Sequence, residues 1–261
     1  MTAQSHRSAP RTLDRRTLQR DHRYLATLLR SGLSVLDVGC GTGAITSGVA
    51  KAVGPKGRVV GVDRDAVLLE LACEEYGAIP NLSFERGDAA TLAFRSEFDI
   101  VTAARTLQWI PEHGTAISKM KQAVKPTGML VVLDYSHTRN QWEPDPPDEF
   151  KRFYRAFLDW RQANHWDNEI AAHLPELFRS AGLADIQSHV QDEIVVRGDP
   201  DFPERTALWT ETIESAGEQL SEAGLCTRLE LQAARDGYAA WVKTELKRQT
   251  LWMRTVTGSV V

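Results

Sequence analysis

The sequence has few cysteines, no long apolar run and no strong excess of charge of either sign. Cys40, Cys73 and Cys226 are an odd number without regular spacing, which argues against a disulfide scaffold and favours a reducing compartment such as the cytoplasm. No apolar stretch approaches the roughly 18 residues that a membrane-spanning helix needs. A net charge of −4 gives no reason to expect nucleic acid as a partner. No histidine, cysteine and carboxylate cluster has metal-ligand spacing, so no metal site is predicted.

What the chain does contain is typical of a folded protein of one or two domains. Its 261 residues are 42% apolar and 25% charged, enough for one large α/β domain with an accessory unit. Residues 1–30 hold seven arginines and two aspartates, a local charge of +5. Such a start resembles an organelle transit peptide, but the leucine spacing predicts a helix over about 14–30 instead. Residues 1–10 are predicted to be a disordered tail.

Strands and helices alternate through the first half of the chain. Apolar runs at 35–38, 59–63, 82–85, 98–102 and 129–134 read as strands, and helical spacing lies between most of them. This alternation predicts crossover units, that is, a doubly wound parallel sheet with helices on both faces. Beyond residue 134 the pattern changes to a proline-rich loop, an aromatic helix at 148–163, further helices, and strand-like runs at 184–190, 192–197 and 251–261.

The most informative segment is Val-Leu-Asp-Val-Gly-Cys-Gly-Thr-Gly at 35–43. A buried strand leads into a loop whose glycines allow backbone conformations closed to other residues, so a ligand can approach the main chain at the following helix. The loop also satisfies the relaxed dinucleotide fingerprint, so a nicotinamide or flavin oxidoreductase is an alternative.

Three carboxylates at strand ends favour a different ligand. Asp37 would repel a pyrophosphate but suits an ammonium or sulfonium cation. Asp63 ends the second strand, where a carboxylate can accept both ribose hydroxyls, and Asp88 closes the third, where it can accept from an adenine amino group. Each also has a structural interpretation: Asp37 as a partner of its own loop, Asp63 as a helix N-cap, and Asp88 as a turn former.

These segments resemble the motifs of class I S-adenosylmethionine-dependent methyltransferases, over about residues 25–135. The five matching segments are VLDVGCGTG (35–43), VVGVDRD (59–65), FERGDA (84–89), FDIVTAARTLQWI (98–110) and VKPTGMLVVLD (124–134). The wider pattern is similar to the small-molecule enzymes of ubiquinone and menaquinone biosynthesis. Position 108, near which many relatives carry histidine, departs from the pattern. So does the missing Asn-Pro-Pro-Tyr after the fourth strand, which argues against nucleobase or glutamine substrates.

The resemblance implies S-adenosyl-L-methionine as cofactor and a set of residues around it. The glycine loop should line the cofactor, the second and third motifs should hold its ribose and adenine, and the loop after strand four should cover its methionine end. The implied cofactor-binding residues are Asp37, Gly39, Cys40, Gly41, Gly43, Asp63, Arg64, Gly87, Asp88, Ala89, Arg105, Thr106, Gln108 and Trp109.

The resemblance also implies a Rossmann-like, doubly wound seven-stranded sheet in the order 3-2-1-4-5-7-6, its last strand antiparallel. The implied division is a core at 11–135, a helical lid or substrate region at 136–166 and 198–248, and completion of the core sheet at 167–197 and 249–261. The two lid segments are expected to pack together over the carboxyl ends of the strands.

Residues outside the motifs are candidates for the substrate end of the site. His137, just past strand five, is the candidate general base, with Tyr135 as a hydrogen-bond donor. Trp142, Phe153 and Trp166 are candidate substrate-binding residues for an aromatic or hydrophobic acceptor, although aromatics at helical spacing more often form a core. The expected partner is a small molecule, with no membrane or nucleic acid, and the protein is expected to be a monomer or homodimer. The alternative is a non-catalytic cofactor-binding regulatory protein of the same fold.

The basic N-terminal helix generates the first testable prediction. In the family that this chain resembles, such a helix often closes over the cofactor, so Arg23 and Tyr24 are expected to meet the methionine carboxylate. Arg23→Ala should then weaken the affinity for S-adenosylmethionine in a calorimetric titration. Unchanged affinity would refute this role.

Overall fold

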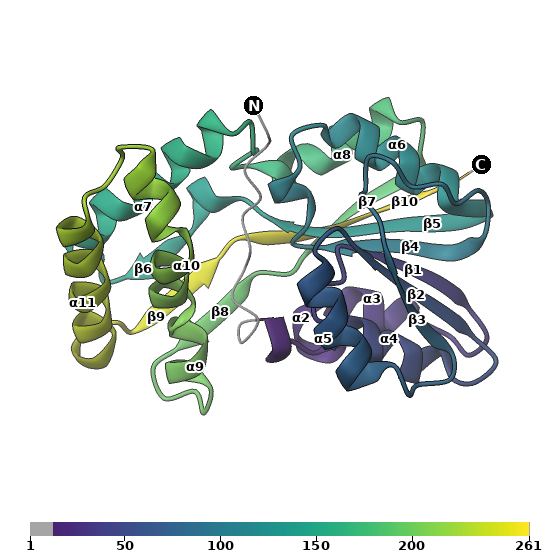
Figure 1. The fold of residues 1–261 in the computed structure, drawn as a ribbon, viewed down its shortest axis with the longest axis horizontal. Helices are drawn as coiled ribbons and strands as arrows, with labels where there is room; N and C mark the ends of the chain where they lie inside the picture. The colour runs from purple at the N-terminus through teal and green to yellow at the C-terminus, as the bar shows by residue number, and fades with distance from the viewer. Residues whose placement is uncertain (1–12, 261) are drawn as a thin grey trace. The chain divides into compact units, whose positions relative to one another are not determined.

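The computed structural model describes residues 13–260, which divide into two compact units (Figure 1). The core unit comprises residues 13–134, 170–191 and 253–260. The helical unit comprises residues 135–169 and 192–252. The predicted disordered tail at 1–10 lies outside the described residues.

The core unit is built on a seven-stranded sheet in the order β3-β2-β1-β4-β5-β10-β7. Its strands are β1 (Ser34–Val38), β2 (Arg58–Asp63), β3 (Leu82–Arg86), β4 (Phe98–Ala104), β5 (Val124–Tyr135), β7 (Ala184–Val190) and β10 (Met253–Ser259). Neighbours from β3 to β5 are parallel, whereas β10 runs antiparallel to β7. With β7 and β10 as the sixth and seventh strands of this sheet, the predicted order 3-2-1-4-5-7-6 is confirmed.

The strands of this sheet are apolar on both faces because helices cover both. Leu36 and Val60 belong to one buried cluster with the helices α6 (His113–Ala123) and α8 (Ile170–Ser180). Val35 and Val59, one position away, belong to a second cluster with α2 (Leu18–Asp21), α3 (Arg23–Leu28) and α4 (Ala44–Val53). Helix α5 (Ala66–Tyr76) packs on β2 and β3, and its last residue, Tyr76, packs against the second cluster. Successive residues of a strand point to opposite faces, so residues 35, 37, 100 and 102 face α2–α4.

The single helix predicted over 14–30 is wrong, because α2 and α3 are separate. The chain leaves the helical conformation at His22, where φ is −143° and ψ is 50°. The Thr17 side chain caps α2, and the Asp21 carboxylate accepts the Thr17 N–H at 2.7 Å. Side chains that bond to nearby backbone compete with a continuous helix, and the leucine spacing does not reveal this competition.

The helical unit consists of four α-helices, a short 3₁₀ helix (His137–Arg139) and a small sheet. The α-helices are α7 (Asp148–Ala163), α9 (Phe202–Thr206), α10 (Leu208–Glu222) and α11 (Arg228–Thr244), and α11 packs against both α7 and α10. Thr227 and Glu230 form a reciprocal capping box at the start of α11. The antiparallel sheet has the order β6-β9-β8, formed by Gln141–Glu143, Arg248–Leu251 and Glu193–Val196. Among residues 13–260, no helix has the length and apolar character to span a membrane.

The division into two units corrects three predicted boundaries. Residues 192–197 and 249–252 were predicted to complete the core sheet, but they lie in the helical unit, as do residues 167–169. The predicted strand at 251–261 is two strands, β9 and β10, separated at Trp252. Trp142, predicted to lie in a loop, is in β6. A strand's own side-chain pattern shows its exposed and buried faces but does not say which remote segment it pairs with.

The close approach of α2 to α4 generates a prediction about stability. A Cβ added at Gly48 in α4 would lie 2.8 Å from the Leu18 Cβ, so Gly48→Ala should displace α2 and lower the free energy of unfolding by at least about 1 kcal/mol. Gly237 in α11 is the matched control, because a Cβ there meets nothing nearer than 4.0 Å. Gly237→Ala should instead stabilise by about 0.5–1 kcal/mol. Urea denaturation measures both, and equal effects would contradict the assigned contact.

Candidate active site

The glycine loop joins β1 to α4 and has a left-handed backbone at all three glycines. The φ angles of Gly39, Gly41 and Gly43 are 77°, 56° and 78°. A Cβ at Gly39 would lie 2.3 Å from the Thr106 Oγ1, and one at Gly43 would lie 2.7 Å from the Phe84 ring. Side chains are therefore excluded from the loop by the backbone angle and by close packing.

The end of β2 brings Asp63 to this loop, and Asp88 lies just past the end of the neighbouring strand β3. Asp63 Oδ2 accepts the Gly41 N–H at 2.8 Å and its Oδ1 accepts the Asp65 N–H at 2.9 Å. The N-cap of α5 is Asp65, not Asp63, so the helix-cap interpretation of Asp63 is wrong. Asp88 Oδ1 accepts the Ala90 N–H at 2.8 Å. This bond corresponds to the turn-forming role given above as the structural interpretation of Asp88.

Other predicted cofactor residues lie at the same strand ends. Gly87 donates its N–H to the Asp63 carbonyl at 3.0 Å, which ties the end of β3 to the end of β2. Ala89 is buried in the first core cluster, whereas Arg64 is exposed. Cys40 is half-buried, and burial, with Asp37 and Asp63 nearby, raises the pKa of its thiol well above the ordinary value. Cys40 is therefore a neutral thiol near neutral pH rather than a nucleophilic thiolate.

Asp37 is a buried carboxylate without a basic partner among residues 13–260. It is 3% exposed, and its Oδ2 accepts the Thr46 hydroxyl at 2.6 Å. Burial raises the pKa of Asp37 to about 6; the hydrogen bond from Thr46 opposes the rise and the charge of Asp63 adds to it. A carboxylate held in this way is stabilised by any cation that comes near it.

The loop after β4 packs against both the glycine loop and β5. The Thr106 Oγ1 lies 3.5 Å from the Gly39 carbonyl oxygen. Gln108 donates its backbone N–H to the buried Asp134 at 3.1 Å and its side-chain amide to the Arg105 carbonyl at 3.1 Å. Trp109 is half-buried in the short 3₁₀ helix Leu107–Trp109. The side chain of Arg105 is buried against Asp21.

The N-terminal residues Arg23 and Tyr24 lie in the first turn of α3. Arg23 is exposed, and the Tyr24 ring stacks on His189 of β7 with centroids 3.6 Å apart. Sequence reasoning missed their neighbours Asp21 and His22, which are 6% and 0% exposed. The signal was present, since both lie at helical spacing from Leu18 and Leu25.

His22 contacts the middle of the sheet. Its Nε2 lies 2.9 Å from the Thr102 Oγ1, and its Nδ1 has no partner among residues 13–260. Burial, and then the charge of Arg105, lower its pKa to about 3, so the ring is neutral at neutral pH. Thr102 pairs in register with Asp37 of β1, which puts His22 on the same face of the sheet as that carboxylate.

The candidate catalytic residues belong to the helical unit. Tyr135 and His137 are each 6% exposed, and their rings stack with centroids 5.2 Å apart. The His137 N–H donates to the Asn168 carbonyl at 2.7 Å, and its carbonyl accepts the Tyr154 hydroxyl at 2.6 Å. Burial and the nearby Arg161 lower the pKa of His137 well below its ordinary value, so its imidazole is neutral at neutral pH.

The candidate substrate residues lie in an extended aromatic cluster of the same unit. Trp142 donates its Nε1–H to the Gln249 Oε1 at 3.0 Å and packs on Trp209 with centroids 5.9 Å apart. Phe153 is 2% exposed, and Trp166 packs edge-on against Trp160 at 5.1 Å. Each of the three therefore contributes to the core of this unit.

Comparisons with known proteins agree with this geometry. A family model described as a methyltransferase domain matches residues 29–182, more than half of the chain. The chain belongs to the class I S-adenosylmethionine-dependent methyltransferases. S-adenosyl-L-methionine is accordingly its cofactor, and methyl transfer is its class of reaction.

Individual relatives have more specific names. A demethylmenaquinone methyltransferase from Staphylococcus aureus is 30% identical over 178 residues, covering 61% of this chain and 71% of the relative. The structure of phosphoethanolamine N-methyltransferase 2 from Haemonchus contortus is similar with a TM-score of 0.57 and 19% identity, over 92% of this chain and 52% of that one. An S-adenosylmethionine-dependent methyltransferase from Aquifex aeolicus has a TM-score of 0.55 and 15% identity, over 98% of this chain and all of its own.

The residues of this methyltransferase fit the cofactor of its family. Asp37 and Asp63 place two carboxylates beside the glycine loop, and no basic residue among 13–260 neutralises Asp37. Such a site would repel a pyrophosphate and attract the ammonium and sulfonium charges of S-adenosylmethionine. A Cβ added at Gly41 would have one described atom within 4 Å, the Leu13 Cδ1 at 3.2 Å.

Asp37 generates a prediction with opposite signs for stability and binding. Its pKa is raised in the folded state, so its charge destabilises the fold at pH 7.5, and this cost disappears as the pH falls from about 6 toward 3.8. Asp37→Asn should therefore stabilise the protein at pH 7.5 by on the order of 2–3 kcal/mol, and by less at pH 4.5. Urea denaturation at the two pH values measures this.

The same variant should bind S-adenosylmethionine more weakly at pH 7.5, by about 10-fold, because one carboxylate is lost beside a cation. Titration of both S-adenosylmethionine and S-adenosylhomocysteine separates the two cations, since only the first carries the sulfonium charge. If Asp37→Asn stabilises the protein without any loss of affinity for S-adenosylmethionine, Asp37 has only a structural role, as a hydrogen-bond partner of residues near it.

Proposed function

We propose that this protein transfers the methyl group of S-adenosylmethionine to a small-molecule acceptor with an aromatic or hydrophobic body. The observation that carries the cofactor part is the pair of carboxylates, Asp37 and Asp63, at the glycine loop. Under this proposal Asp63 accepts the ribose hydroxyls, and Asp88 with Ala89 contacts the adenine. Asp63 would keep its bond to the Gly41 N–H and accept the hydroxyls at the remaining lone pairs of its two oxygens.

The acceptor part of the proposal is supported by the helical unit. Its core is aromatic, and two buried hydrogen-bond donors in it, Trp209 Nε1 and Gln249 Nε2, have no partner among residues 13–260. Buried donors without partners are uncommon, and an oxygen of a ligand would satisfy them. The similar Staphylococcus aureus enzyme is named for demethylmenaquinone, which supports the same class of acceptor.

The chemistry requires little from the protein beyond alignment and removal of a proton. S-adenosylmethionine supplies a methyl group already activated by its sulfonium. A nucleophilic atom of the acceptor would form a bond to the methyl carbon as the carbon–sulfur bond breaks. The electron pair of the broken bond would remain on sulfur, and the acceptor would lose a proton. We propose that the neutral imidazole of His137 takes this proton, with Tyr135 oriented beside it.

The setting of this activity is also proposed. Cys40, Cys73 and Cys226 are free thiols in the structure, which supports a reducing compartment such as the cytoplasm. We propose that the protein acts there as a monomer or homodimer.

Calorimetry and mass spectrometry together test the function. The purified protein should bind S-adenosylmethionine and S-adenosylhomocysteine with micromolar affinity and should release a product heavier by one methylene from a panel of phenols, quinols and amines. Binding without any product across the panel would favour a regulatory cofactor-binding protein. Failure to bind either ligand would refute the function itself.

His137→Gln tests the proposed base. The substitution should lower kcat by about 10²-fold, the lower end of what a general base contributes, while leaving KM for the cofactor unchanged. His173→Gln is the matched control, because His173 is exposed on α8, and it should leave kcat unaltered. An unchanged kcat in His137→Gln would remove His137 from the mechanism.

A further inference from the structure

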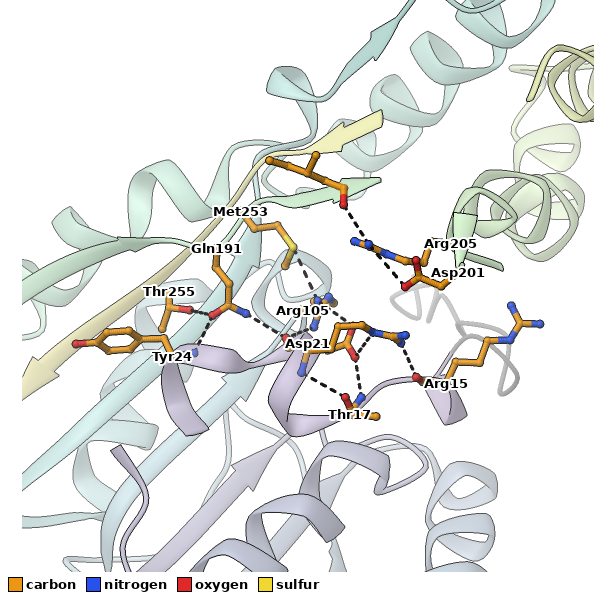
Figure 2. Close-up of polar contacts among 12 residues, drawn as sticks. Arg15, Thr17, Asp21, Tyr24, Arg105, Gln191, Asp201, Arg205, Met253 and Thr255 are labelled. Carbon is orange, nitrogen blue, oxygen red and sulfur yellow. Dashed lines mark hydrogen bonds and ion pairs between the residues drawn. The ribbon is translucent and has the colours of Figure 1, made fainter. Parts of the chain in front are cut away.

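Arg105 occupies an unusual position at the end of β4. Its φ is +58°, in the left-handed region that a non-glycine residue adopts at a cost of about 1 kcal/mol or more. Its side chain is buried, and Figure 2 shows it pointing at Asp21. One guanidinium nitrogen, Nη1, donates to the Asp21 carbonyl at 2.9 Å, and Nη2 lies 3.8 Å from the Asp21 carboxylate and 3.9 Å from the Met253 sulfur.

Asp21 is one of the points at which residues 17–28, called here the N-terminal segment, are fastened to the core sheet. Its carbonyl also accepts from the Gln191 Nε2 at 3.2 Å. The Gln191 Oε1 in turn accepts the Thr255 hydroxyl at 2.8 Å and the Tyr24 N–H at 3.3 Å (Figure 2). Arg105 and Gln191, which directly follow β4 and β7, therefore bind the segment at one peptide carbonyl.

The backbone of Arg105 is fixed on its other side to β5 and to the loop that contains Thr106. Its N–H donates to the Leu133 carbonyl at 2.7 Å, and its carbonyl accepts the Gln108 side chain at 3.1 Å. The next residue, Thr106, fills the space beside Gly39 where a Cβ would lie 2.3 Å from its Oγ1. A small rotation of the backbone at Arg105 would therefore move Thr106 against the glycine loop or away from it.

We propose that Arg105 is a positioning residue that couples docking of the N-terminal segment to the shape of the glycine loop. It acts through Asp21 on one side and Thr106 on the other, without touching the cofactor itself. Coupling of this kind is reciprocal: if docking strengthens cofactor binding, cofactor binding must strengthen docking by the same factor. This inference rests on the proposed function and replaces the predicted contact of Arg105 with the methionine end.

The test uses the full chain and measures affinity for S-adenosylhomocysteine together with hydrogen–deuterium exchange. Arg105→Met keeps the length and apolar part of the side chain and removes the donors to Asp21. Gln191→Leu loosens the segment from the opposite side and leaves the glycine loop and Thr106 untouched. Arg58→Met is the control, because Arg58 is an exposed arginine of β2 paired at 3.5 Å with Glu97.

We expect the dissociation constant to rise about 10- to 50-fold in Arg105→Met, within the usual range of coupling between sites, and about 5-fold in Gln191→Leu, with no change in Arg58→Met. In the wild type the ligand should slow exchange across residues 17–28, and in Arg105→Met this slowing should be lost. If Arg105→Met does not fold, Arg105→Lys, which retains one donor, should show both effects at smaller size.

Two results would overturn the proposal. In the first, Arg105→Met binds weakly but the ligand still slows exchange in residues 17–28, which would mean a direct contact with the ligand. In the second, Gln191→Leu speeds exchange in residues 17–28 with affinity unchanged.

A wild-type chain that does not bind S-adenosylhomocysteine would refute the proposed function. The coupling between residues 17–28 and the loop after β4 could still be tested without ligand. Gln191→Leu should then speed hydrogen–deuterium exchange at residues 103–110 as well as at 17–28, and an effect confined to 17–28 would refute the coupling.

Discussion

The hydrogen bond from the Gly41 N–H to the Asp63 carboxylate fixes the shape of the glycine loop, on which the rest of the candidate site in the core unit depends. It connects the turn after β1 to the end of β2 and fixes a glycine whose backbone is left-handed. The Gly39 N–H, which donates to the Val62 carbonyl at 2.7 Å, makes a second connection between the same two strands. Because the loop is shaped by the ends of its own strands, the site has its form before any ligand binds, and binding energy need not be used to build it.

The acidic character of this site conflicts with folding stability. Burial of Asp37 next to Asp63 costs free energy whenever both are ionised, and Thr46 offsets only part of that cost. Functional sites commonly retain such a conflict, because the group that would be most stable there is not the group that the chemistry needs. The resulting charge would also repel the phosphates of the dinucleotides that similar glycine loops bind.

The core of the fold could be predicted because its signals are local. The run from Val35 to Gly43 contains strand, turn and helix start in sequence order, and strand order followed from the family resemblance. The small sheet could not be predicted, since Trp142 and Gln249 meet across about a hundred residues of chain and neither segment shows a pairing partner in its own pattern. Asp21 and His22 lie at helical spacing from Leu18 and Leu25, on the predicted buried face, but no role was predicted for them.

The place of β10 between β5 and β7 has a consequence for how the chain folds. Strands β1 to β5 can pair as soon as they are synthesised, but β7 has no neighbour in the core sheet other than β10. The whole segment 192–252, with three of the four α-helices of the helical unit, lies between these two strands in sequence. The sheet therefore stays open at one edge throughout the synthesis of those helices, and β5 exposes an unpaired edge to other chains until β10 arrives.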